Sequence, residues 1–198
     1  SSDLVKKYLN EVVLENTLFK VVSEVSRVIP SSTISVAKLC GWGVSPLTKK
    51  DWSHKIFAVP RLVKFNEMEY SIPVERMKDV VLEIAETVKR EQHRVHFPIE
   101  CRFVKGDDLW LSPAYGRDSA YIAAHMYKGM DYHRYFNALE SIYKNNQGRP
   151  HWGKMHTRDA RDFAQLYPMW NDFLKLRSEF DPTGIFLTPY MKKIFGLI

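Results

Sequence analysis

Residues 94–104 alternate between apolar and polar side chains, and this pattern restricts the fold more than any other part of the sequence. The apolar set is Val95, Phe97, Ile99, Cys101 and Phe103. The polar set includes His96, Glu100 and Arg102. Because successive side chains of a β-strand point to opposite faces, the alternation predicts a strand in a sheet. We expect the odd-numbered residues to face the core and the even-numbered ones to line a polar face.

The N-terminal segment has a different, helical period. Residues 3–29 carry apolar side chains three and four positions apart, typical of an amphipathic helix or helix pair that ends at Pro30. Residues 31–50 contain Gly41, Gly43 and Pro46, which predicts an irregular connection. The sequence therefore predicts an N-terminal helical arm over residues 1–50 and a main domain over residues 51–198.

The main domain mixes further strand and helix patterns. Strands are predicted at 65–70, 109–113 and 120–127. Helices are predicted to follow Pro73, Asp131 and Thr157, and Pro168 is expected to interrupt the last of them. Strands are interspersed with helices, but without regular strand-helix-strand crossovers. This order favours an α+β fold in which helices cover an antiparallel sheet.

Charge and motif content narrow the possible functions. The 198 residues carry a net charge of +6, but the 29 basic residues are interleaved with 23 acidic ones, which indicates a solvated surface and no nucleic-acid partner. Cys40 and Cys101 lie outside any Cys/His cluster, so we expect free thiols, no metal and a cytoplasmic location. Membrane attachment through sequence outside this chain stays open. Phosphate-loop, hydrolase and zinc motifs are missing, which leaves independent catalysis unsupported.

Two short segments could carry chemistry. Glu100 and Arg102 leave the same face of one predicted strand, although an ordinary ion pair on a solvated sheet would explain them too. Residues 148–154, with the sequence GRPHWGK, place His151 and Lys154 in a loop or short strand. That loop also fits a turn in which Trp152 fills the core. A third group, around His54, is the weakest signal.

These segments together resemble the aldonolactone oxidase family of vanillyl-alcohol-oxidase-type flavoproteins, which includes L-gulonolactone and D-arabinono-1,4-lactone oxidases. The matching segments occur in family order and are Ser53–Phe57, Pro98–Phe103, Gly148–Lys154 and Asp181–Leu187, with Tyr190. The resemblance runs from about residue 50 to the end. Thr188 departs from it, because an asparagine is common at that position in the family.

The resemblance implies that this chain is the substrate-binding half of a FAD-dependent enzyme. In such enzymes a separate N-terminal domain binds most of the FAD, and this chain does not contain that domain. The complete enzyme would oxidise a sugar 1,4-lactone or related polyol, pass a hydride to the flavin and reduce oxygen to hydrogen peroxide. The expected partners are the FAD-binding domain and a small sugar lactone. This chain alone is expected to be inactive.

The resemblance also assigns roles to individual residues. Arg102 and Lys154 would be catalytic and cofactor-binding, with Arg102 stabilising negative charge on the flavin. Glu100 would bind substrate hydroxyls and assist removal of a hydroxyl proton. His151 would orient the loop that carries Lys154 and contribute to cofactor binding, and His54 would lie in the same pocket. Two alternatives stay open: a flavin-free small-molecule binding domain, and a dehydrogenase that uses another electron acceptor.

Overall fold

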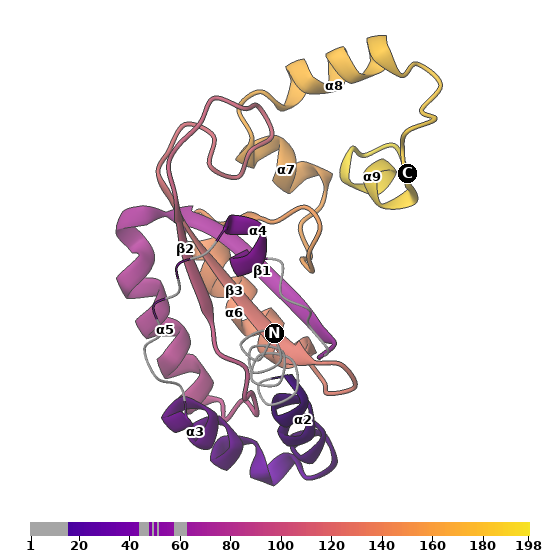
Figure 1. The fold of residues 1–198 in the computed structure, drawn as a ribbon. Coiled ribbons are helices and arrows are strands. Elements are labelled where there is room, and N and C mark those ends of the chain that lie inside the picture. The colour runs from indigo at the N-terminus through magenta and orange to yellow at the C-terminus, as the bar shows by residue number, and fades with distance from the viewer. Residues whose placement is uncertain (1–15, 44–47, 49, 51, 58–62) are drawn as a thin grey trace. The chain divides into compact units, whose positions relative to one another are not determined.

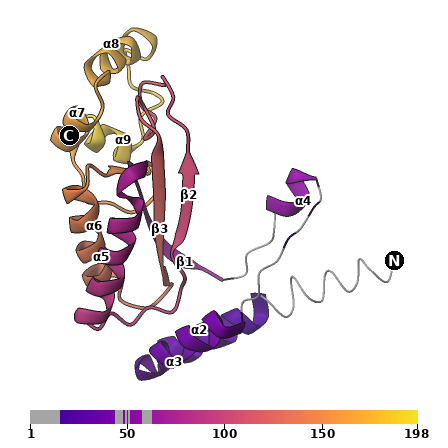
Figure 2. The ribbon, with the colours of Figure 1, turned by 90° about the vertical axis from the view of Figure 1, so that its left-hand side faces the viewer.

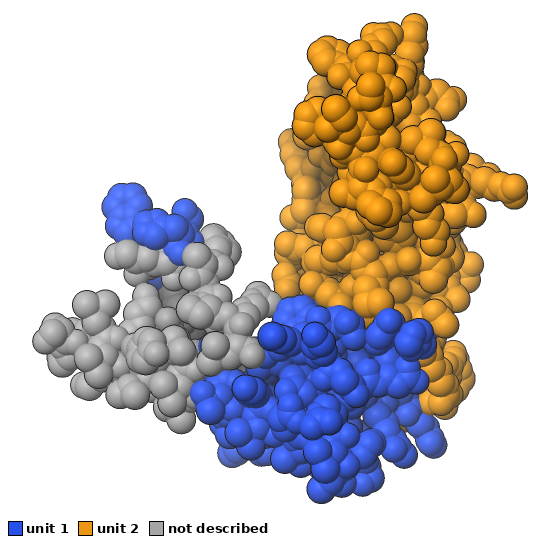
Figure 3. Space-filling model, turned by 90° about the vertical axis from the view of Figure 1, so that its right-hand side faces the viewer, with its two compact units in different colours: residues 1–66, 92–98, 125–133 blue, residues 67–91, 99–124, 134–198 orange. Residues whose placement is uncertain are grey.

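The computed structural model describes residues 16–43, 48, 50, 52–57 and 63–198. Its contacts divide the chain into two units (Figure 3). Unit 1 comprises residues 1–66, 92–98 and 125–133, and unit 2 comprises residues 67–91, 99–124 and 134–198. The boundary predicted at residue 50 stays a prediction.

A four-stranded sheet organises the structure (Figure 1). Its strands lie in the order β2 (Glu100–Val104), β3 (Ser119–Tyr127), β1 (Phe65–Pro73) and β4 (Arg149–Pro150). β2 pairs antiparallel with β3, with Arg102 opposite Tyr121, and β1 pairs antiparallel with β4, with Ser71 opposite Arg149. The α+β class and the antiparallel sheet are therefore confirmed.

Two helices cover one face of the sheet (Figure 2). After the 3-10 turn η3 (Val74–Arg76), α5 covers Met77–Arg90, and α6 covers His133–Asn145. The buried side chains between sheet and helices are Met68, Tyr70, Ile72, Val80, Ile84, Ala120, Ile122, Ala124, Phe136, Leu139 and Tyr143. Each large apolar side chain buried in this way contributes roughly 1.5–3 kcal/mol, so this layer is the main core of unit 2.

A second, aromatic core forms from the C-terminal helices α7 (Ala160–Leu166), α8 (Trp170–Phe180) and α9 (Pro189–Ile194). Its buried members are Phe163, Tyr167, Trp170, Ile194 and Phe195, with Trp152 packed against them. Asp159 caps α7, and Pro168 lies in the break before α8, as predicted. Thr188, the departure from the family pattern, is the N-cap of α9, and its side chain accepts a hydrogen bond from the Met191 N–H.

The arm predicted at the N-terminus is helical, but its second half was predicted wrongly. α2 covers Leu18–Val28, η2 covers Pro30–Ser32, α3 covers Thr33–Gly43, and the short α4 covers Ser53–Phe57. The irregular connection expected after Pro30 is therefore mostly helix. Pro30 stands at the first position of η2, where a missing N–H costs nothing, so it begins a helical segment as well as following one. Residues 3–15 of the predicted helix lie outside the described residues.

The strand predicted over residues 94–104 is shorter than expected, and its apolar face is not core. Only Glu100–Val104 form β2, and Cys101 and Phe103 are exposed, Phe103 to 68%. His96, expected on the polar face, is buried. β2 has a neighbour on one side only, and Pro98 lacks the N–H that a ladder needs. A period of two therefore identified a strand here, but it did not identify burial.

Residues 109–113, predicted as a strand, form turns instead. The Asp107 carboxylate accepts hydrogen bonds from the Leu109 N–H at 3.1 Å and from the Ser112 hydroxyl at 2.6 Å. An aspartate that bonds a backbone N–H two residues ahead favours a turn over a strand.

Among the described residues, no helix is long and apolar enough to cross a lipid bilayer.

Buried His96 should make unit 1 sensitive to acid. Its Nε2 lies 2.9 Å from the Ser23 hydroxyl, and burial lowers the pKa of His96 to about 4. An unfolded histidine titrates near pH 6.5, so the unfolded chain binds a proton first as the pH falls. We expect the unfolding free energy to be intact above about pH 6.5 and to fall by about 2 kcal/mol towards pH 4.

Urea unfolding at about pH 7 and about pH 4.5 measures this effect. His96→Gln keeps a group that can hydrogen-bond but does not titrate, so it should lose less stability over the same interval than the wild-type chain. Equal losses in the two proteins would show that other groups cause the acid sensitivity.

Candidate functional site

Glu69 is the centre of a polar cluster on the sheet face turned away from α5 and α6. The neighbouring Tyr70 donates its hydroxyl to Glu140 on α6, so Glu69, one position earlier in β1, points to the opposite face. There the Arg102 guanidinium donates to Glu69 Oε1, and the Lys154 ammonium donates to Glu69 Oε2. One carboxylate thus binds two cations from distant segments of the chain.

Two more carboxylates complete this group, which we call the Glu69 cluster: Glu67, Glu69, Glu100, Arg102 and Lys154. Lys154 Nζ lies 2.6 Å from Glu67 Oε1, and Arg102 Nε lies 3.5 Å from Glu100 Oε1. The Glu69 side chain is 0% exposed, Lys154 19% and Arg102 50%. The cluster therefore has a buried anionic base, while Arg102 reaches solvent.

The carboxylates keep Arg102 charged. Burial alone would lower the pKa of the Arg102 guanidinium, but Glu69, Glu100 and Glu67 outweigh it and raise that pKa above its usual value. The guanidinium contacts the Glu69 and Glu100 carboxylates through Nη2 and Nε. Within the described part of the chain, no hydrogen bond or ion pair uses Nη1, so this nitrogen can donate to an acceptor from outside the cluster.

The pairing of β1 with the segment after β4 brings Lys154 to Glu69. Ser71 lies opposite Arg149, and the same antiparallel register places His151 opposite Glu69. The His151 N–H donates to the Glu69 carbonyl at 2.9 Å, and the Met155 N–H donates to the Glu67 carbonyl at 2.9 Å. Lys154 lies between these two bonds, so its backbone is tied to the strand that carries its carboxylate partners.

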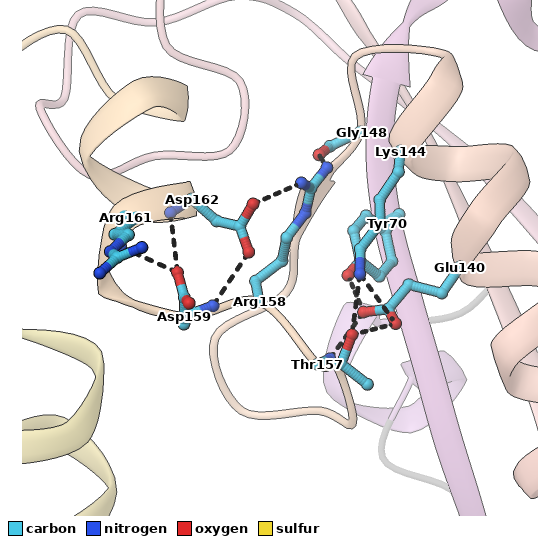
Figure 4. Close-up of polar contacts among 9 residues, drawn as sticks. All are labelled: Tyr70, Glu140, Lys144, Gly148, Thr157, Arg158, Asp159, Arg161 and Asp162. Carbon is cyan, nitrogen blue, oxygen red and sulfur yellow. Dashed lines mark hydrogen bonds and ion pairs between the residues drawn. The ribbon is translucent and has the colours of Figure 1, made fainter.

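Both ends of this segment are also fixed, as Figure 4 shows. At Gly148, a side-chain Cβ would come within 2.6 Å of the Tyr143 carbonyl oxygen, so only glycine fits this close approach. At the other end, the Thr157 N–H and hydroxyl donate to buried Glu140 at 2.6 and 2.5 Å. Arg158 joins the two ends by donating to the Gly148 carbonyl.

The two candidate histidines lie in different units. His151 accepts a hydrogen bond from the Gly153 N–H through Nδ1 at 3.1 Å, which leaves the proton of a neutral ring on Nε2. His54 is exposed and lies on the short helix α4 in unit 1. The roles predicted for both histidines stay predictions.

Of the predicted catalytic residues, Arg102 and Lys154 meet at Glu69, and Glu100 lies beside Arg102. Sequence reasoning missed Glu69 and Glu67. Their signal was present, because two glutamates alternate with Met68 and Tyr70 in a strand that is buried from residue 68 to residue 73. Acidic side chains on the inner part of a buried strand need partners, and this need could have marked them.

Comparisons with known proteins agree with the resemblance seen in the sequence. The family model described as "D-arabinono-1,4-lactone oxidase" matches residues 2–194. An L-gulono-1,4-lactone dehydrogenase of Mycobacterium tuberculosis is 39% identical over 182 residues, which cover 92% of this chain and 42% of the relative. The L-gulonolactone oxidase of Mus musculus is 40% identical over 148 residues, covering 72% of this chain and 34% of the relative.

A more distant relative is the alditol oxidase of a Streptomyces species, which is 31% identical over 124 residues, covering 61% of this chain and 27% of the relative. The chain therefore spans about two fifths or less of the length of these curated relatives.

Proposed function

Since this chain belongs to the D-arabinono-1,4-lactone oxidase family, we propose that it is the substrate-binding part of a FAD-dependent enzyme that oxidises a sugar 1,4-lactone. Members of the family are generally flavoproteins. The proposal includes a separate FAD-binding domain as the partner of this chain, because residues for the bulk of the cofactor would come from the part of the relatives that the chain does not cover.

The observation that carries the proposal is the meeting of Arg102 and Lys154 at Glu69. The two cations on this sheet face provide hydrogen-bond donors for a ligand that is rich in acceptors. The nearby Glu100 provides a carboxylate that can accept a proton. A flavin suits this set because its ring presents hydrogen-bond acceptors, and Arg102 has Nη1 left to donate. Arg102 and Lys154 would hold the ring, and His151 could donate from Nε2.

When bound, the flavin supplies a two-electron acceptor for the hydride that leaves the substrate carbon. The chain's own residues would bind and orient the lactone. Glu100, beside Arg102 and partly exposed, would accept the hydroxyl proton as the carbonyl forms. Arg102 would stabilise negative charge that develops next to it, because a fixed cation needs no reorganisation during the reaction.

We further propose oxygen as the final electron acceptor, with hydrogen peroxide as product. The names of the mouse and Streptomyces relatives support an oxidase, whereas the Mycobacterium relative is named a dehydrogenase. A flavin-free binding domain is the competing function from another class.

The test uses the full-length polypeptide that contains this sequence, loaded with FAD. Aldono-1,4-lactones should bleach the flavin absorbance without oxygen, and peroxide should appear when oxygen is admitted. Bleaching without peroxide, but with turnover on an artificial acceptor, would replace the oxidase by a dehydrogenase. If no lactone or polyol bleaches the flavin, the proposed activity is wrong. The 198-residue chain alone should retain no FAD.

A further inference from the structure

We propose that Glu69 is a positioning residue, which holds Arg102 and Lys154 at a fixed separation for the reaction. The inference rests on the proposed function for its kinetic consequences. Glu69 itself would touch neither lactone nor flavin, because its side chain is fully buried beneath its two partners. It would act through the cations.

The geometry supports a bridging role more than a simple ion pair. Each oxygen of the Glu69 carboxylate binds a different cation, Oε1 binding Arg102 and Oε2 binding Lys154. A carboxylate is rigid and planar, so this one group fixes the positions of both cations relative to each other. A buried carboxylate without partners is strongly destabilised, which keeps both contacts formed.

The charges give a second reason. Arg102 and Lys154 would repel each other if they approached one site without an anion between them. Lys154 also has a long, flexible side chain with a large rotamer entropy, so it needs an anchor to stay in one place. Glu67 also binds Lys154, but only Glu69 binds both cations, so Glu69 fixes Lys154 relative to Arg102 before substrate arrives. Preorganised donors of this kind accelerate reactions.

The first variant is Glu69→Gln in the flavin-loaded, full-length protein. Arg102 and Lys154 bind different oxygens of Glu69, and an amide replaces one of these oxygens with an NH2 donor, so one of the two cations would lose its acceptor. We expect kcat to fall by about tenfold while KM for the lactone changes by less than about twofold. Glu83→Gln, which changes an exposed carboxylate on α5, is the matched control and should keep wild-type kinetics.

A second readout does not depend on activity. Acetylation of lysines by acetic anhydride, followed by mass spectrometry, measures how tightly Lys154 is held. With exposed Lys78 as the internal reference, Lys154 should react several-fold faster in Glu69→Gln than in the wild-type protein. Unchanged reactivity of Lys154 would overturn the positioning role.

Glu69→Asp provides a variant that keeps the buried charge if the glutamine variant does not fold. Its carboxylate is one methylene shorter and should not reach both cations, so Lys154 reactivity should rise here too. Wild-type kcat and wild-type Lys154 reactivity in this variant would also overturn the inference.

A mutant cycle separates positioning from a general structural effect. In an Arg102→Ala, Lys154→Ala background, adding Glu69→Gln should change the rate of flavin bleaching by less than about twofold, because no cation remains to position. A further tenfold loss in that background would show that Glu69 acts in another way. If the wild-type protein oxidises no lactone, the proposed function fails, whereas the acetylation result still decides whether Glu69 holds Lys154.

Discussion

Replacing Arg102 with alanine in the flavin-loaded, full-length protein is expected to lower the rate of lactone oxidation by about 100-fold, or roughly 3 kcal/mol of transition-state stabilisation. The expectation rests on the proposed function. Arg102 is half exposed, and its Nη1 contacts none of the cluster's carboxylates. Truncation of Arg102 therefore removes a charged donor that can act on a bound ligand. Substrate binding should weaken less than the rate, because the charge it stabilises develops during the reaction.

The stability of the protein should fall by only about 1–2 kcal/mol, because the Oε1 atom of buried Glu69 loses one donor. Arg102 opens no core cavity when truncated, and buried Glu69 keeps Lys154 as a partner. Stopped-flow measurement of anaerobic flavin bleaching gives the rate, and urea unfolding gives the stability. Arg102→Lys is the control: it keeps the charge but not the forked donors, so its rate should lie between the other two. Bleaching at the wild-type rate in Arg102→Ala would remove Arg102 from the catalytic group.

The regular parts of the fold were predictable because local pattern and burial agree in them. In strand β1, helix α5 and strand β3, apolar side chains recur at the spacing of the element, and side chains at this spacing are buried in the core. Residues 94–104 show where this reasoning stops. Cys101 and Phe103 follow a strand period, but whether a strand face is buried depends on which strands flank it, and β2 has a neighbour on one side only.

The candidate site could be predicted in part for a similar reason. Arg102 and Lys154 were identified from short motifs, and the resemblance to a family linked them. Glu69 was not identified in this way. Its contact with Lys154 depends on the pairing register between β1 and the segment after β4, which brings a lysine from a remote loop to a glutamate in the strand. Pairing register is a long-range property that the period of a single strand does not contain.

Glu140 connects α6 to the end of the segment that carries Lys154, and its removal should be the most destabilising change in this region. We expect Glu140→Ala to reduce the unfolding free energy by about 3 kcal/mol. The Glu140 side chain is 3% exposed and accepts hydrogen bonds from the Tyr70 hydroxyl at 2.5 Å and from two groups of Thr157. The hydroxyl of Tyr70, a fully buried residue, and both Thr157 donors would lose their acceptor.

The same contacts predict the effect of acid on Glu140. Burial alone would raise the pKa of this carboxyl, but the hydrogen bonds from Thr157 and Tyr70 outweigh burial and lower the pKa below its usual value. A lowered pKa in the folded state means that the stabilisation is present above the unfolded pKa, near 4.3, and is lost as the pH falls through the folded value. The difference in stability between wild type and Glu140→Ala should therefore shrink in acid.

Urea unfolding of both proteins at about pH 7 and about pH 3 measures this difference. Lys144→Ala is the matched control, because it removes the cation 3.4 Å from Glu140 but leaves every hydrogen bond from Tyr70 and Thr157 in place. A partly exposed pair one helical turn apart contributes little, so this variant should lose less than about 1 kcal/mol. Lys144 also donates to the Thr157 hydroxyl at 2.8 Å. If Lys144→Ala destabilises the chain as much as Glu140→Ala, the contacts of Lys144 with Glu140 and Thr157, and not the hydrogen bonds to Glu140, hold the segment of Lys154 to α6.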